Sequence, residues 1–197
     1  MTQLPGRLVL LGHPVAHSKS PAFQNAALAA AGIPLTYEAV DVEPSMFVDV
    51  VRDLRHARAS GNVTVPHKER MRDACDALTP LAERVGAVNT FWVDGAGQLV
   101  GDNTDVAGFS QAVALLLGAS PHGLAVGVIG AGGSAAAVLA AVESWPNSSA
   151  MVFNRTAARA RMLCERFSSV AQSTDDIREI GRAQLVVNAT TIGLGDD

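Results

Sequence analysis

A buried strand that leads directly into a glycine-rich turn constrains this chain more than any other feature. Residues 124–129 form an almost continuous apolar run, and the sequence GAGGSA follows at 130–135. The turn fits the pattern G-x-G-x-x-G/A, and a helical pattern over 133–143 comes after it. The first glycine permits a tight turn, the second lets the backbone approach a pyrophosphate, and the small third residue lets helix and strand pack closely. The segment therefore predicts a Rossmann-like dinucleotide site, with its phosphates at the helix N-terminus, bound by Gly130, Ala131, Gly132, Gly133 and Ser134.

The residues after the next predicted strand favour NADP over NAD. NAD-binding folds place an acidic residue at this position, where it binds the ribose 2′-hydroxyl. Here the strand 150–153 is followed by Asn154, Arg155 and Thr156, with Arg159 one turn further on. No carboxylate repels a phosphate, and two guanidiniums can pair with a phosphate dianion. Arginines at this spacing are also common on solvated helix faces, so the prediction depends on the glycine turn upstream.

Strands alternate with helices along the chain, which predicts an α/β fold with two domains. In the first half we expect strands over 7–12, 35–42, 61–66, 87–93 and 98–100, with helices over 20–31, 47–54 and 71–78. Asp94-Gly95 marks a turn between the last two strands. In the second half we expect strands over 124–129, 150–153 and 184–188, with helices over 105–117, 133–143, 157–167 and 175–181. This order implies parallel sheets with right-handed crossovers, a first domain over 1–105, a second over 106–197, and the helix 105–117 as the link.

Short polar segments recur at the strand ends of the first half. They are GHPVAHSKSP at 12–21, NVTVPHK at 62–68, GAVNT at 86–90 and GDNTD at 101–105. Hydroxyls, amides, a lysine and carboxylates together suit a small polyhydroxylated anion, because amides and hydroxyls both donate and accept hydrogen bonds. Strand alternation puts Asn62 and Thr64 on one face. Lys68 opens the next helix, where the helix dipole disfavours a cation, so its presence favours a functional role.

These segments resemble, in the same order, the successive motifs of the shikimate dehydrogenase family. The glycine turn, residues 154–159 and the segment NATT at 188–191 complete the series, so the resemblance covers nearly the whole chain. It implies an N-terminal α/β substrate domain plus a Rossmann-like NADP-binding domain, with the substrate cleft between them. The implied activity is the reversible NADP-dependent reduction of 3-dehydroshikimate to shikimate, an oxidoreductase step of aromatic amino-acid biosynthesis.

The resemblance also implies a role for each matching residue. Lys68 is implied to be the catalytic acid/base, with Asp105 beside it. The implied substrate ligands are Ser18 and Ser20 for the carboxylate, and Asn62, Thr64, Asn89 and Asp105 for the ring hydroxyls or carbonyl. Besides residues 130–134, the implied cofactor residues are Asn154, Arg155, Thr156, Arg159, Asn188 and Thr190. Elementary chemistry agrees, because a lysine ammonium can protonate a forming alkoxide and a nearby carboxylate favours the charged lysine.

Two departures from the family pattern stand out. Val106 follows Asp105, where family members usually carry glycine. The chain ends at Asp197, whereas family members continue with the rest of the cofactor domain and a helical segment whose glutamine contacts substrate. The resemblance therefore implies that the cofactor domain is incomplete at its C-terminus.

Composition excludes several other classes of function. The formal net charge is −4 and no long basic run occurs, which argues against nucleic acid or an anionic membrane as partner. No apolar stretch is long enough to span a bilayer. Cys75 and Cys164 lack metal-ligand spacing, so we expect reduced thiols, no metal and a cytoplasmic protein, either a monomer or a homodimer.

Three alternative functions remain open at this point. The first is a quinate/shikimate dehydrogenase that uses NAD. The second is a methylenetetrahydrofolate-type dehydrogenase, although the first half has few aromatic residues to stack on a pterin. The third is a non-catalytic homologue that binds shikimate in order to regulate, against which the intact Lys68 and Asp105 argue.

Overall fold

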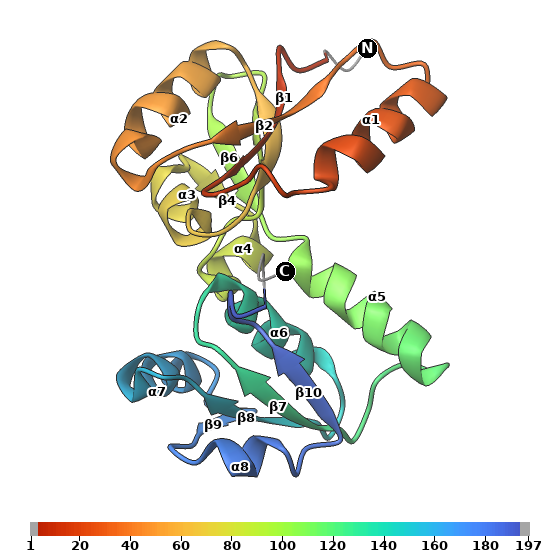
Figure 1. Ribbon diagram of the computed structural model, residues 1–197, viewed down its shortest axis with the longest axis vertical. Coiled ribbons are helices and arrows are strands. Elements are labelled where there is room, and N and C mark those ends of the chain that lie inside the picture. Colours follow the sequence, from red (N-terminus) through yellow and green to blue (C-terminus); the bar gives the residue numbers. More distant parts are fainter. Residues whose placement is uncertain (1–3, 194–197) are drawn as a thin grey trace. The chain divides into compact units, whose positions relative to one another are not determined.

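The chain forms two compact units, residues 1–103 and 104–197 (Figure 1). The computed structural model describes residues 4–193. The division falls two residues before the predicted boundary, so that helix α5 (Asp105–Leu117) belongs to the second unit. There α5 packs on helix α6 (Gly133–Ser144) and the loop after it, where Phe109 stacks on Trp145 with ring centroids 5.6 Å apart. Among the described residues, no helix combines the length and apolar character needed to cross a membrane.

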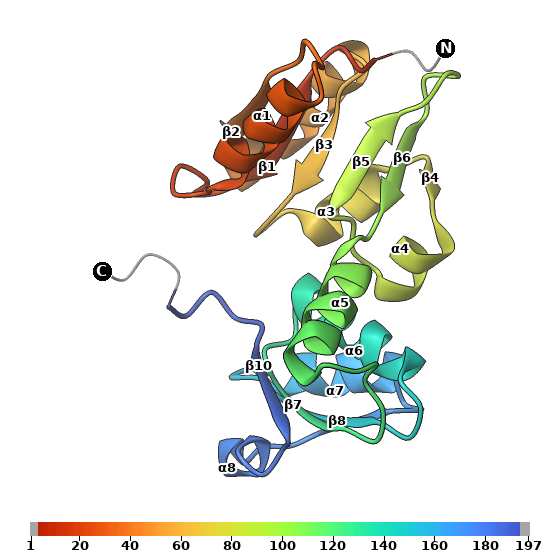
Figure 2. The same cartoon turned by 90° about the vertical axis from the view of Figure 1, so that its right-hand side faces the viewer.

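The first unit contains a six-stranded mixed sheet in the order β2-β1-β3-β5-β6-β4. The strands are β1 (Leu8–Gly12), β2 (Tyr37–Asp41), β3 (Ser60–Val63), β4 (Ala77–Leu78), β5 (Thr90–Val93) and β6 (Leu99–Asp102). Strands β2, β1 and β3 are parallel as predicted, but β5 runs antiparallel to both of its neighbours (Figure 2). The predicted turn at Asp94-Gly95 joins β5 and β6, so this sheet is mixed, whereas the alternation of strands and helices indicated parallel sheets. The reason is the short turn between β5 and β6, which can join only antiparallel strands.

Helices cover this sheet and close its core. They are α1 (Ser20–Ala30), the 3₁₀ helix η1 (Pro44–Met46), α2 (Phe47–His56), α3 (Lys68–Ala74) and α4 (Pro80–Val85). Phe47, Val51 and Leu54 of α2 are buried, as their spacing predicts, in a cluster with Leu11 and Phe91 of the sheet. Burying side chains of this size contributes roughly 1.5–3 kcal/mol each.

The predicted helix 71–78 is wrong at its C-terminal end. Helix α3 stops at Ala74, and the next residues form β4 and then α4. The Thr79 hydroxyl accepts a hydrogen bond from the N–H of Ala82 and so caps a new helix that Pro80 opens. This helix ends at Gly86, whose φ of 68° is left-handed. Helix α3 itself ends because Cys75 has an extended backbone conformation, so the apolar spacing of 71–78 continues past the end of the helix into β4.

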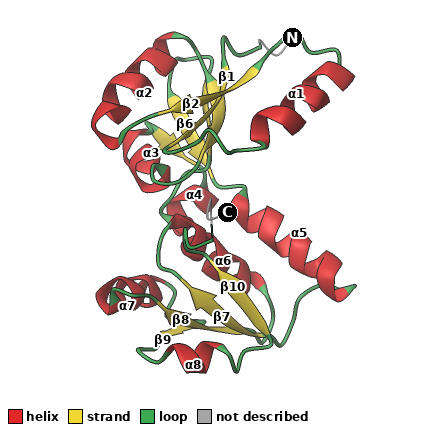
Figure 3. Ribbon diagram, viewed as in Figure 1, coloured by secondary structure: helices red, strands yellow, loops and turns green. Residues whose placement is uncertain are grey.

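The second unit contains a four-stranded parallel sheet in the order β10-β7-β8-β9 (Figure 3). The strands are β7 (Ala125–Ile129), β8 (Ser149–Phe153), β9 (Ala171–Ser173) and β10 (Leu185–Asn188). The helices after α6 are α7 (Ala157–Arg166) and α8 (Ile177–Ile180). Every residue of α6 from 135 to 142 is buried, because α6 lies between the sheet and α5. The parallel sheet and its helices follow the prediction; only the three-residue β9 was not expected.

Candidate functional site

One edge of the first sheet brings the predicted polar segments together. Because β5 is reversed, its first residue, Thr90, pairs with Asn62 near the end of β3 and with Asp102 at the end of β6. Backbone hydrogen bonds join the adjoining loops: Thr64 N–H donates to the Leu11 carbonyl at 2.8 Å. Residues 12–21, 62–68, 86–90 and 101–103 thus meet at the carboxyl ends of β1, β3 and β6, and we call this the polar edge.

The helix that starts with Lys68 is fixed to the polar edge by its neighbours. The backbone carbonyl of Lys68 accepts a hydrogen bond from Val88 N–H at 2.9 Å. His67, directly before it, is fully buried, and its Nε2 lies 2.6 Å from the carbonyl oxygen of Val42. Burial lowers the pKa of His67, so the ring is held neutral. Lys68 itself is half-buried at the first position of α3, as predicted.

The other predicted substrate residues of the first unit lie in or beside the same loops. Ser18, Ser20, Asn62 and Thr64 are half-buried, and Asn89 is buried. Ser20 is the first residue of α1, and Lys19 is its N-cap. The Ser18 hydroxyl accepts a hydrogen bond from Ser20 N–H at 3.2 Å. The two serines are thereby linked at the start of α1.

Asp105 and Val106 are the first residues of α5 and fall in the second unit. Asp105 is half-buried and follows Asn103, whose amide donates to the Ala87 carbonyl at 2.9 Å inside the first unit. Val106 is buried within the helix, so a valine fits at this position. The pairing of Asp105 with Lys68 remains a prediction.

Sequence analysis missed Tyr37, which lies outside the polar edge, and assigned no role to Thr90. The Tyr37 hydroxyl donates to Asn62 Oδ1 at 2.8 Å, and Asn62 Nδ2 donates to Thr90 Oγ1 at 3.1 Å. Tyr37 is the single tyrosine of the sequence and lies in a predicted strand. A buried tyrosine usually finds a partner for its hydroxyl, and this was the only available signal.

The glycine turn of the second unit has the geometry that a dinucleotide requires. Gly130 has a φ of +121°, and a Cβ at this position would lie 2.7 Å from the carbonyl oxygen of Ala189. At Gly132 an added Cβ would meet no atom within 4 Å, so this stretch of backbone faces open space. Gly132 is also the N-cap of the twelve-residue helix α6 and has no capping side chain. The open backbone at the start of α6 suits a pyrophosphate.

The remaining predicted cofactor residues lie at the same carboxyl edge of the second sheet. Asn154 donates to the Thr156 carbonyl at 3.0 Å in the loop after β8. Arg155 and Arg159 are exposed, and neither forms an ion pair within residues 4–193. Their guanidiniums can therefore meet a ribose phosphate without first leaving a carboxylate partner.

Asn188 and Thr190 form a local turn after β10. The Thr190 N–H and hydroxyl both donate to Asn188 Oδ1, at 3.0 and 2.7 Å. Between them, Ala189 N–H donates to the Ile129 carbonyl at 2.8 Å, directly before the glycine turn. Asn188 and Thr190 thus fix the backbone of Ala189, which lies beside Gly130.

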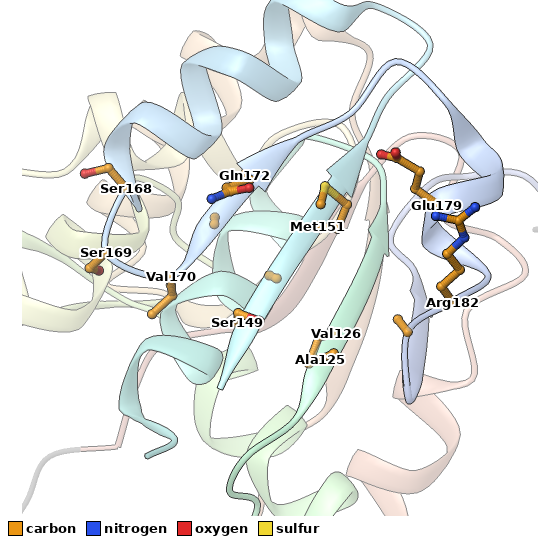
Figure 4. A pocket seen from close by; sticks show the side chains of 13 residues that line it. Ala125, Val126, Ser149, Met151, Ser168, Ser169, Val170, Gln172, Glu179 and Arg182 are labelled. Carbon is orange, nitrogen blue, oxygen red and sulfur yellow. The ribbon is translucent and has the colours of Figure 1, made fainter. Parts of the chain in front are cut away.

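A hollow of about 450 Å³ on the second unit is a separate feature (Figure 4). Ala125 and Ser149, which line it, are the first residues of β7 and β8. Glu179 and Arg182 border it from the segment of α8. In open α/β sheets, ligands bind outside the carboxyl ends of the strands, so the hollow lies away from the expected cofactor edge.

The sequence matches two protein-family models in succession. The model of the shikimate dehydrogenase substrate binding domain covers residues 10–91, and that of shikimate / quinate 5-dehydrogenase covers residues 113–192. The curated shikimate dehydrogenase (NADP(+)) of Methylobacterium radiotolerans is 42% identical over 195 residues, which are 95% of this chain and 69% of that protein. That of Geobacter metallireducens is 40% identical over 200 residues, with 96% and 70% covered.

Solved structures agree with these matches. Shikimate dehydrogenase from Aquifex aeolicus superposes with a TM-score of 0.87 at 31% identity, covering 100% of this chain and 73% of that one. The Thermus thermophilus enzyme, in complex with NADP(H) and shikimate, gives 0.80 at 39% identity, with 95% and 69% covered. The Listeria monocytogenes enzyme, in complex with shikimate and NAD, gives 0.81 at 30% identity, with 99% and 73% covered.

Proposed function

The chain belongs to the shikimate dehydrogenase family, and we propose that it catalyses the reversible NADP-dependent reduction of 3-dehydroshikimate to shikimate. The observation that carries this proposal is the polar edge, where the segments of Asn62, Lys68 and Asn89 meet although the sequence separates them. Amides, hydroxyls and a cation gathered at one sheet edge match the oxygens of a polyhydroxylated acid.

Substrate binding in this proposal uses both ends of the polar edge. Ser18 and Ser20 bind the carboxylate through hydroxyl groups at the start of α1. Asn62, Thr64 and Asn89 bind the ring oxygens, with Asp105 as a further ligand. Because these side chains are half-buried or buried, their hydrogen bonds form in a partly water-excluded setting and are stronger than in bulk water.

Lys68 is the proton donor of the proposed reduction. Its ammonium gives a proton to the ketone oxygen while a hydride adds to the ketone carbon, and it stabilises the charge that develops on oxygen. NADPH, when bound, supplies the hydride. The neutral His67 contributes no competing positive charge next to Lys68. In the reverse direction the amine of Lys68 accepts the hydroxyl proton.

Cofactor binding in this proposal uses the carboxyl edge of the second sheet. Residues 130–134 bind the pyrophosphate, and Arg155 and Arg159 bind the 2′-phosphate, with Asn154 and Thr156 shaping the loop. Asn188 and Thr190 lie beside the cofactor. NAD is the second candidate, because the Listeria monocytogenes relative was solved with NAD.

We also infer a cytoplasmic location and a monomer or homodimer. The two thiols, Cys75 and Cys164, are free, which suits a reducing compartment. Burial raises the pKa of both thiols to about 11, so they remain protonated and inert at neutral pH.

Formation of NADPH from shikimate and NADP⁺ tests the proposal directly. We expect kcat/KM for shikimate with NADP⁺ to exceed the values for quinate and for NAD⁺. A preference for NAD⁺ or quinate would select the second candidate, and shikimate binding without any turnover would indicate a regulatory homologue. Absence of both binding and turnover would reject the proposed function.

A further inference from the structure

A chain of side-chain hydrogen bonds crosses the polar edge from a residue outside the family motifs. The Tyr37 hydroxyl lies 2.8 Å from Asn62 Oδ1, and Asn62 Nδ2 lies 3.1 Å from Thr90 Oγ1. Thr90 Oγ1 in turn lies 3.0 Å from Asn89 Oδ1. Four side chains from three segments of the sequence are thus connected in a single row.

The orientation of the Asn62 amide is fixed by a group that can only accept a hydrogen bond. Asn62 Nδ2 also lies 3.4 Å from the backbone carbonyl of Asn89, which can only accept a hydrogen bond. This places the NH₂ group of Asn62 towards Thr90 and its oxygen towards Tyr37. The Tyr37 hydroxyl is therefore the donor, and the Thr90 hydroxyl accepts from Asn62 and donates to Asn89.

Tyr37 is itself held in place through both its side chain and its backbone. Its side chain is buried, at 4% exposure, and burial raises its pKa to about 12, so it keeps its proton at neutral pH. Its backbone is bound on both sides by the Asn25 amide, which donates to the Tyr37 carbonyl at 3.0 Å and accepts from its N–H at 2.8 Å. Helix α1 and strand β2 thereby fix the position of the hydroxyl.

We propose that Tyr37 is a positioning residue for substrate binding, which orients the amide of Asn62 and, through Thr90, the amide of Asn89. This inference rests on the proposed function, since it concerns the same substrate. With Asn89 Oδ1 directed at Thr90, the donor end of the Asn89 amide is directed away from Thr90. A ketone oxygen can only accept a hydrogen bond, so a fixed donor suits 3-dehydroshikimate and an amide free to flip suits it less.

A double-mutant cycle tests the inference. Removing one hydrogen bond typically changes binding about tenfold or less, so Tyr37→Phe is expected to raise KM for shikimate by about that factor. The KM for NADP⁺ is expected to stay unchanged. In the Asn62→Ala background, Tyr37→Phe is expected to change KM for shikimate less than about twofold, because its partner is already absent.

A purely structural role of Tyr37 predicts a different result. Asp76→Asn provides the matched control, because Asp76 pairs with Arg55 at 2.8 Å and accepts the Leu99 N–H at the opposite end of β6. This variant is expected to lower the melting temperature without raising KM for shikimate. If Tyr37→Phe behaves like the control, or if its effect adds fully to that of Asn62→Ala, the inference is overturned.

Thr90→Val keeps the inference testable should Tyr37→Phe not fold. Valine replaces the hydroxyl with a methyl group of similar size and interrupts the chain between the two amides. We expect KM for shikimate to rise about tenfold or less, and a KM equal to that of the parent protein would overturn the inference. A parent protein that does not oxidise shikimate would instead reject the proposed function, so the two failures are distinguishable.

Discussion

The imidazole of His67 donates a hydrogen bond from Nε2 to the carbonyl oxygen of Val42, at 2.6 Å. The ring is fully buried and stacks on Phe47, with centroids 4.9 Å apart. Among the described residues Nδ1 has no partner, so an added proton there would be buried without a hydrogen bond. The histidine before Lys68 therefore ties the end of β2 to the start of α3 in its neutral form, and an added proton would be buried at Nδ1 without an acceptor in the described part of the chain.

This geometry predicts a loss of stability in acid. Burial lowers the pKa of His67 in the folded state, and the charges of Arg70 and His13 act in the same direction, whereas the hydrogen bond to Val42 and the charge of Asp41 oppose them. Between the unfolded pKa, about 6.5, and the lower folded pKa, only the unfolded chain binds the proton. Stability is thus retained above about pH 6.5 and lost as the pH falls below it.

Thermal unfolding from pH 8 to pH 5 measures this effect, with His67→Gln as the matched variant. Glutamine can donate to Val42 but does not titrate, and all other groups are shared. The parent protein is expected to lose melting temperature more steeply in acid than the variant. Parallel curves would contradict the assignment.

Substitution of Lys68 tests the proposed proton donor. Lys68→Ala is expected to lower kcat by roughly 10²–10⁴-fold, the usual contribution of a general acid or base. Binding of shikimate, measured by calorimetry, is expected to remain detectable. Arg72→Ala is the control, because it removes a positive charge from the exposed part of the same helix. Unchanged turnover in Lys68→Ala would remove the lysine from this role.

The two arginines after β8 are expected to distinguish NADP from NAD. Hydrogen bonds between charged groups are worth about 1.5–3 kcal/mol, so Arg155→Gln is expected to raise KM for NADP⁺ about tenfold or more. The KM for NAD⁺ is expected to change little, because NAD⁺ has no 2′-phosphate. Arg161→Gln on the adjoining helix α7 provides the control, since Arg161 faces Asp175 at 3.4 Å. Equal effects on both cofactors would contradict the predicted 2′-phosphate site.

Alanine substitutions at two glycines of the turn are expected to impair the protein for different reasons. Gly130→Ala forces a Cβ against the Ala189 carbonyl at a φ of +121°, and such strain costs about 1–3 kcal/mol. Gly132→Ala has open space around its Cβ and an ordinary φ of −104°. We therefore expect Gly130→Ala to lower the melting temperature, and Gly132→Ala to leave it unchanged while weakening NADP⁺ binding. Normal NADP⁺ binding by a folded Gly132→Ala would contradict the site.

The second unit was largely predictable because its signals are local. The buried run 124–129, the glycine turn and the apolar helix that follows lie in one continuous stretch, and α5 begins and ends as expected at residues 105 and 117. Strand β9 was missed because only one of its three residues is buried, which leaves no alternation to detect.

The first unit was less predictable because its sheet depends on contacts between distant residues. Thr79-Pro80 and Gly86 mark helix α4, which was not predicted, and the apolar spacing across 71–78 continued past the end of α3 at Ala74. The motifs of Asn62 and Asn89 were visible separately, whereas their connection through Tyr37 and Thr90 exists only once β5 pairs with β3. Register between strands is a tertiary property, and a single sequence specifies it weakly.

Because strand β5 is antiparallel to its neighbours, insertions or deletions at its two ends are expected to have different effects. The hairpin at 94–97 lies at the far end, where Asp94 Oδ1 accepts the N–H of Ala96 and Gln98. Extra residues inserted there, such as a peptide tag, would lengthen an exposed loop and leave the substrate residues in place. One residue deleted from 86–89 would instead slip β5 by one position and turn every one of its side chains to the opposite face.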